Sequence, residues 1–125
     1  MSNTQNEITV IAIGGGGFTH ETDPDLEDFI LAQSPVKHPN IGFIGAASHD
    51  SPSRIDLFYR RFLGSAQSPS HLLQSASIQT AKDWVSQQDI IYVGGGDTQH
   101  LLNYCRKNQL DHELAIAANS GTILA

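Results

Sequence analysis

The sequence predicts an α/β fold, a doubly wound parallel sheet with helices on both faces. Two unbroken apolar runs, Ile8 to Ile13 and Ile41 to Ala46, are typical of parallel strands that are covered on both sides. A third apolar run, Ile90 to Val93, is followed by three glycines. Segments with a helical spacing of apolar residues separate these runs, and such alternation favours a parallel sheet.

The composition fits one globular α/β domain that spans residues 1–125. The chain has 39% hydrophobic and 16% charged residues and a formal net charge of −6 at pH 7. With basic pairs only at Arg60-Arg61 and Arg106-Lys107, this acidic chain is a poor match for non-specific nucleic-acid binding. No apolar segment approaches the length of a membrane span, and Met1 to Glu7 lacks a secretion-signal pattern. We therefore expect a cytoplasmic protein with neither a nucleic-acid nor a membrane partner.

Cysteine and histidine usage gives no indication of a metal or cofactor. Cys105 is the only cysteine, which excludes an intrachain disulfide and a cysteine-based metal site. It falls on the apolar face of an expected helix beside Leu101 and Leu102, which favours a core position. No two histidines are spaced as metal ligands on a helix, and the following five are interpreted as surface residues: His20, His38, His71, His100 and His112.

Two helices are expected in the first half of the chain. Asp23 and Pro24 have the pattern of an N-cap and first helical residue. One face of that helix would carry Leu26, Phe29 and Ile30. A second helix begins at Ser51-Pro52 and ends at Gly64. Its apolar residues follow the i, i+3, i+4, i+7, i+8 pattern: Ile55, Phe58, Tyr59, Phe62 and Leu63.

The second half is expected to continue the alternation. A strand is placed between Leu72 and Ile78, and a short helix over Ala81 to Gln87, with Trp84 and Val85 facing inward. After the third apolar run, Asp97 or Thr98 can cap a helix that begins at Gln99 and stops at Asn108. A further helix runs from Asp111 through Ala118, and Thr122 to Ala125 begins another strand.

Three loops of small residues follow expected strands, at positions 14–17, 46–48 and 94–98. The carboxyl ends of parallel strands meet at one edge of a sheet, so we expect these loops to converge there. Nucleotide-binding motifs do not fit the first loop, since Thr19 occupies the third glycine position of the dinucleotide pattern and no Gly-Lys-Ser/Thr follows. A structural turn and a wall of a substrate pocket both stay open for this loop.

The loop Gly94-Gly95-Gly96-Asp97-Thr98 is the strongest candidate site. A strand, a glycine turn and a helix N-terminus together present several backbone N–H groups, and such a place binds an anion or an oxygen that becomes one. Three glycines in a row indicate that something approaches the backbone closely. Ser48, His49 and Asp50 contain the residue types of a catalytic triad, but neighbouring side chains diverge, so a polar loop that caps the next helix is the better interpretation.

These segments resemble the dipeptidase E family of serine peptidases, peptidase family S51. The resemblance is carried by residues 11–18, by the strand end at residues 44–48, and above all by Ile91-Tyr92-Val93-Gly94-Gly95-Gly96-Asp97-Thr98 with the later Leu101-Leu102 and Leu110-Asp111. Most members have Asn where this chain has Asp97. The resemblance implies a doubly wound sheet like that of class I glutamine amidotransferases.

The resemblance also implies a function, the metal-independent hydrolysis of short or Asp-containing peptides. In this family a nucleophilic serine sits on a Gly-x-Ser-Ala-Gly elbow, and glycine amides such as those of Gly95 and Gly96 form the oxyanion hole. The candidate substrate-binding residues are listed by loop: Gly15 and Gly16, Ser48, and Asp97 and Thr98. The expected partner is a small peptide substrate.

No Gly-x-Ser-x-Gly occurs in these 125 residues, and Thr122 to Ala125 resembles the strand that leads into the elbow. We therefore expect a chain truncated before the nucleophile, which is inactive alone and able to self-associate. Two alternatives stay open: a natural short relative that acts as a non-catalytic binding or assembly module, and a small nucleotide-binding module.

Overall fold

A sheet of four parallel strands, in the order β2-β1-β3-β4, forms the centre of the molecule. The computed structural model describes residues 7–13, 24–63 and 68–125. The strands are β1 (Asn40–Ile44), β2 (Ser68–Leu72), β3 (Ile90–Val93) and β4 (Ile123–Leu124). This arrangement confirms the parallel α/β sheet that the apolar runs predicted.

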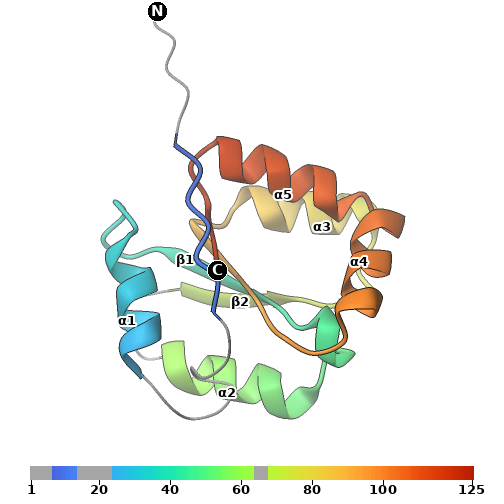
Figure 1. The fold of residues 1–125 in the computed structure, drawn as a ribbon, viewed down its shortest axis with the longest axis horizontal. Coiled ribbons are helices and arrows are strands. Elements are labelled where there is room, and N and C mark those ends of the chain that lie inside the picture. Colours follow the sequence, from blue (N-terminus) through green and yellow to red (C-terminus); the bar gives the residue numbers. More distant parts are fainter. Residues whose placement is uncertain (1–6, 14–23, 64–67) are drawn as a thin grey trace, which may run out of the picture.

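Helices cover both faces of the sheet. Along the chain they are α1 (Pro24–Ala32), the single 3₁₀ turn η2 (Ala46–Ser48), α2 (Pro52–Phe62), α3 (Ile78–Ser86), α4 (Thr98–Lys107) and α5 (Leu110–Asn119). Figure 1 shows α1 and α2 on one side of the sheet and α3, α4 and α5 on the other. The structure is therefore doubly wound, as the sequence predicted.

Each face of the sheet has its own hydrophobic core. On the side of α1 and α2, the ring of Phe43 stacks on Phe58 with centroids 5.1 Å apart, and Phe62 packs beside Phe58. On the other side, Ile44 and Ile91 pack against residues of α3, α4 and α5. Burying one such side chain contributes about 1.5–3 kcal/mol. Alternate residues of β1 point to opposite cores, which explains its unbroken apolar sequence.

The strand order places a topological switch point between β1 and β3. After β1 the chain continues to α2 on one face, whereas after β3 it continues to α4 on the other. The segments that follow these two neighbouring strands therefore diverge, and in open α/β sheets this is where ligands bind. The loops at residues 45–51 and 94–97 follow these two strands.

The first apolar run differs from its prediction. Ile8 to Ile13 was expected to form a strand buried on both faces, but Ile8 is 54% and Val10 is 64% exposed. The segment lies beside β4, with one bridge between Val10 and Leu124, and the Ile11 amide donates to the Leu124 carbonyl at 2.8 Å.

The second strand also lies elsewhere. It was predicted between Leu72 and Ile78, but β2 ends at Leu72 and Ile78 is the first residue of α3. Ser77 is the N-cap of this helix, because its hydroxyl accepts a hydrogen bond from the Thr80 amide at 3.1 Å. β2 is an edge strand, which explains how it accommodates Pro69 and a polar sequence.

The predicted helix faces are wrong at three residues. Leu63 was expected on the apolar stripe of the second helix, but it is the C-cap of α2 and is 67% exposed. Phe29 was expected to face inward but is 57% exposed, whereas Glu27 is buried and contacts Arg61, with 3.3 Å between Oε1 and Nε. Leu102 was expected beside Cys105 in the core but is 42% exposed. In α1 and α4 the buried face is rotated relative to the most apolar sequence positions.

Helix ends agree better with the sequence. α2 begins at Pro52, and α4 has Asp97 as its N-cap and Asn108 as its C-cap. The last helix begins at Leu110, one residue before the predicted Asp111. The residue before it, Gln109, has a φ of 58° and serves as the N-cap without a side-chain hydrogen bond.

Candidate functional site

The loops that follow β1 and β3 are joined by two backbone hydrogen bonds. The Gly94 amide donates to the Ile44 carbonyl at 2.9 Å, and the Asp97 amide donates to the Ala47 carbonyl at 2.7 Å. The predicted convergence of these two loops is therefore confirmed. The third loop, with Gly15 and Gly16, lies outside the described residues.

Gly96 is the glycine that this arrangement requires. Its φ is +145°, and a Cβ atom placed on it would lie 2.3 Å from the Ala47 carbonyl oxygen. Any other residue would force the two loops apart. The sequence predicted a close approach to the glycine backbone, and the chain's own Ala47 makes that approach.

Gly95 is exposed and has open space around it, since a Cβ atom there would meet no heavy atom within 4 Å. Among residues that the structure describes, none accepts a hydrogen bond from the amide of Gly95 or Gly96. The Gly95 carbonyl oxygen, in contrast, accepts a hydrogen bond from Nη1 of Arg54 at 2.7 Å. Two successive N–H groups are thus available to a ligand.

Asp97 and Thr98 begin helix α4. A carboxylate oxygen of Asp97 accepts a hydrogen bond from the His100 amide at 3.0 Å, which is the N-cap that the sequence predicted. Thr98 is the first helical residue and is exposed. The positive end of the α4 dipole therefore lies next to the two glycine amides, where it favours negative charge.

Ser48 lies across from this loop, at the end of η2. It is half-buried, and its hydroxyl donates to the Gly45 carbonyl at 3.0 Å. The next residues, His49 and Asp50, have φ values of 55° and 56°. Left-handed backbone is uncommon outside glycine, and two such residues in a row mark a sharp turn between η2 and α2.

The prediction that this polar loop caps the next helix needs correction. Ser51 is the N-cap of α2, but neither it nor its neighbours make a side-chain cap bond there. Asp50 instead accepts a hydrogen bond from the Gln74 amide at 2.8 Å. Its carboxylate therefore fastens the loop after β2 to the loop after β1.

Two histidines meet near this turn. The ring centroids of His49 and His100 are 4.0 Å apart, and Nε2 of His100 lies 2.5 Å from Oε1 of Gln74. His100 is half-buried, so its interpretation as a surface residue was wrong. His71 is half-buried as well and lies 2.6 Å from the Tyr59 hydroxyl. These partners lie far apart in sequence, so no local pattern indicates the contacts.

Arg54 was not identified from the sequence. It lies in the first turn of α2, where the helix dipole disfavours a positive charge. A basic residue in the first turn of a helix is therefore a sequence feature that could have indicated a role other than helix stability. Its contact with Gly95 makes it part of the site.

Cys105 is buried, as predicted, and burial raises the pKa of its thiol. A raised pKa leaves less thiolate at neutral pH, which argues against a nucleophilic role. Within residues 7–13, 24–63 and 68–125, no group of three or more His, Cys, Asp or Glu side chains could hold a metal ion. No helix in the same ranges is long and apolar enough to cross a membrane.

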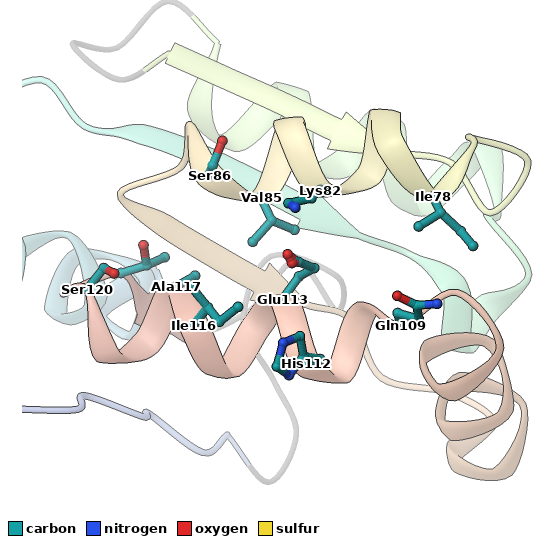
Figure 2. A pocket seen from close by; sticks show the side chains of 11 residues that line it. Ile78, Lys82, Val85, Ser86, Gln109, His112, Glu113, Ile116, Ala117 and Ser120 are labelled. Carbon is teal, nitrogen blue, oxygen red and sulfur yellow. The ribbon is translucent and has the colours of Figure 1, made fainter.

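Neither of two pockets is lined by Gly94, Gly95 or Gly96. A groove of about 500 Å³ runs between α3 and α5, where Val85 and Glu113 point toward each other (Figure 2). An apolar pocket of about 400 Å³ is lined by the ends of three strands, at Ile44, Val93 and Leu124, together with residues of α4 and α5. The second pocket lies on the face of the sheet that carries α4.

Comparison with known proteins gives consistent results. The model of peptidase family S51 matches residues 10–125. The chain is 41% identical over 118 residues to the uncharacterized peptidase YgaJ of Bacillus subtilis (strain 168), and the match covers 93% of this chain and 51% of that protein.

A solved structure shares the fold. It is a crystal structure from Listeria monocytogenes EGD-e that carries a provisional peptidase E name, and it matches with a TM-score of 0.65 and 18% sequence identity. The match covers 81% of this chain and 50% of that one. The chain thus spans about half the length of both relatives.

Proposed function

Because the chain belongs to peptidase family S51, we propose that it forms part of a serine-type peptidase and supplies the oxyanion hole of that enzyme. The amides of Gly95 and Gly96 would donate to the oxygen that becomes negatively charged when a nucleophile attacks a peptide carbonyl. The nucleophilic serine would lie outside these residues, which contain no Gly-x-Ser-x-Gly motif. The proposed substrates are short peptides, including peptides with an N-terminal aspartate.

One observation carries this proposal: the two adjacent amides have no acceptor among the described residues, although hydrogen bonds hold the loop on both sides of them. Gly94 is tied to β1, and Asp97 is tied to η2. Donors that are fixed before the substrate arrives stabilise a developing charge without a further cost of reorganisation. The nearby N-terminus of α4 adds a favourable dipole.

The proposed reaction divides the chemistry between this loop and groups outside it. The serine oxygen forms a bond to the peptide carbonyl carbon, and a histidine takes the serine proton. The carbonyl oxygen becomes an oxyanion that accepts from the Gly95 and Gly96 amides. The histidine then gives the proton to the leaving amine, and water hydrolyses the acyl-enzyme. Asp97, as the N-cap, would hold the start of α4 beside this loop.

The first test is an assay of the complete product of the gene. We expect it to hydrolyse short peptides such as Asp-Xaa dipeptides, to lose activity with a serine-directed fluorophosphonate, and to keep activity in EDTA. Activity that requires a metal ion, or a purified protein that cleaves no short peptide, would contradict the proposal. A protein that binds peptides without cleaving them would favour the non-catalytic binding module.

A matched pair of glycine variants tests the loop itself. Gly96→Ala places a Cβ atom against the Ala47 carbonyl, so the loop must move, and we expect kcat to fall about 100-fold, in the range reported for loss of one oxyanion-hole donor. Gly95→Ala meets no atom within 4 Å and keeps its amide, so its kcat should stay near wild type. Equal activity in both variants would argue against an oxyanion role.

A further inference from the structure

The peptide group between Gly95 and Gly96 is held by a side chain from the opposite face of the sheet. We infer that Arg54 is a positioning residue, which orients this peptide so that the Gly96 N–H is turned toward the candidate oxyanion site. Nη1 of Arg54 donates to the Gly95 carbonyl oxygen at 2.7 Å. The inference deepens the proposed function and rests on it for its catalytic consequence.

The geometry of the peptide bond supplies the next step. In a trans peptide the carbonyl oxygen and the N–H of the following residue point in opposite directions, and no cis peptide occurs in the described part of the chain. With the Gly95 oxygen directed at Arg54, the Gly96 N–H must point away from α2. A flip of this peptide plane would place the Gly95 carbonyl oxygen where the Gly96 N–H now lies. That oxygen would repel an oxyanion.

This peptide needs an external restraint because a glycine stands on each side of it. Glycine accepts a wide range of φ and ψ, so rotation of the peptide plane meets little steric resistance. Gly95 also has open space around its Cα. The Asp97 amide anchors the next peptide, and the Gly94 amide anchors the peptide between Val93 and Gly94, but neither bond involves the peptide between Gly95 and Gly96.

Arg54 is suited to act as that restraint. The ion pairs formed within the described ranges join Arg60 to Asp56 and Arg61 to Glu27 and Asp28, and none includes Arg54. A guanidinium forms a charge-assisted hydrogen bond, here at 2.7 Å, and such a bond is stronger than a neutral one. Its place in the first turn of α2 offers no dipole benefit, so helix stability does not explain it.

The test uses three variants of the complete gene product. Arg54→Gln removes the charge and the reach to Gly95. Arg54→Lys keeps the charge but offers a single ammonium instead of a planar fork. Arg60→Gln is the matched control, since Arg60 is on the same helix, is 70% exposed and pairs with Asp56. The control removes the same charge without touching the loop.

Kinetics give the first readout. We expect Arg54→Gln to lower kcat about 10- to 100-fold while KM stays within about twofold, because a misoriented donor affects the transition state more than substrate binding. Arg54→Lys should lie between this variant and wild type, and Arg60→Gln should match wild type. A kcat for Arg54→Gln within about twofold of wild type would overturn the inference.

Nuclear magnetic resonance gives a second readout that needs no catalysis. Labelling glycine with ¹³C at the carbonyl and ¹⁵N at the amide selects Gly–Gly peptides, and Gly96→Ala identifies the Gly96 signal. We expect this signal to shift and its amide hydrogen exchange to accelerate in Arg54→Gln, with no change in Arg60→Gln. An unchanged Gly96 signal in Arg54→Gln would overturn the inference.

The two readouts separate this inference from the proposed function. If wild type hydrolyses no peptide, the proposed function fails, but the resonance experiment still decides whether Arg54 orients the peptide. If Arg54→Gln does not fold, Arg54→Met takes its place, since it keeps an apolar stem but donates no hydrogen bond, and a wild-type Gly96 signal and kcat in that variant would overturn the inference.

Discussion

Individual side chains in this molecule have roles that depend on which atoms surround them. Gly96 is fixed by the Ala47 carbonyl, whereas Gly95 is free of contacts on the side where a Cβ would be. The Ser48 hydroxyl donates to the Gly45 carbonyl, so this side chain stabilises the local turn. Asp97 is engaged as a helix cap. The backbone amides of the loop are therefore better candidates for ligand contact than its side chains.

Cys105 provides a prediction at this level. Burial raises the pKa of its thiol, and the thiolate is the reactive form. We expect it to react with a thiol reagent such as dithionitrobenzoate at pH 8 about tenfold or more slowly in the native chain than in urea, where a free cysteine has a pKa of about 8.5. Equal rates in both states would show that the core around Cys105 does not shield the thiol.

The sequence revealed backbone roles better than side-chain contacts. A run of three glycines before a helix cap is a local pattern, so the loop at residues 94–98 could be identified. Arg54 contacts Gly95, which lies 41 positions later in the sequence, and His49 contacts His100, which lies 51 positions later. Such contacts follow from the strand order, which local patterns do not contain.

Helices and strands show the same contrast between local sequence patterns and contacts between distant residues. α2 could be predicted because five apolar residues repeat at helical spacing and Pro52 marks its start. β2 could not, since its sequence Ser-Pro-Ser-His-Leu has neither an apolar run nor alternation and is stabilised as an edge by pairing with β1. In α1, the inward position of Glu27 depends on Arg61, which lies on another helix.

The cap of α4 gives a prediction about an element. Asp97→Ala removes the acceptor for the His100 amide, so we expect the free energy of unfolding in urea to fall by about 1 kcal/mol. Asp97→Asn keeps a side-chain oxygen that can accept the same bond, and it should stay within about 0.5 kcal/mol of wild type. If alanine and asparagine destabilise equally, the side-chain cap contributes nothing measurable.

Considered as one body, the molecule depends on two cores that share a sheet, and each core contains a buried tyrosine. Burial raises the pKa of Tyr92 to about 12, and the charge of Glu27 adds to this effect. Burial likewise raises the pKa of Tyr104 to about 12, with smaller effects of Cys105 and Asp50. Tyr92 belongs to the core beside α1 and α2, and Tyr104 to the core beside α4.

These shifts predict alkaline unfolding. A raised native pKa means that the stability present below the unfolded value of about 10 is lost as the pH rises toward 12, because the unfolded state releases the proton first. We expect the free energy of unfolding to fall steeply between pH 10 and 12, and Tyr92→Phe to lessen that fall. Flat stability over this range, measured by urea unfolding, would show that neither hydroxyl is desolvated.

Self-association is expected for the 125-residue chain. The segment beside β4 exposes Ile8 and Val10, and an apolar strand edge is a template for pairing between chains. Sedimentation should show a concentration-dependent dimer or larger species. Val10→Lys should shift the equilibrium toward the monomer, since lysine on an edge disfavours pairing. Thr9→Lys, on a less exposed neighbour, serves as the comparison.

The two hydrogen bonds that join β1 and η2 to the glycine loop also bear on the order of synthesis. Translation proceeds from the N-terminus, and both bonds connect residues 44–47 with residues 94–97. Every atom that fixes the Gly95 and Gly96 amides, including Arg54, therefore leaves the ribosome before any nucleophile encoded after them. Residues 44–97 thus contain every described contact that fixes these two amides, so this one segment would complete the loop when it folds.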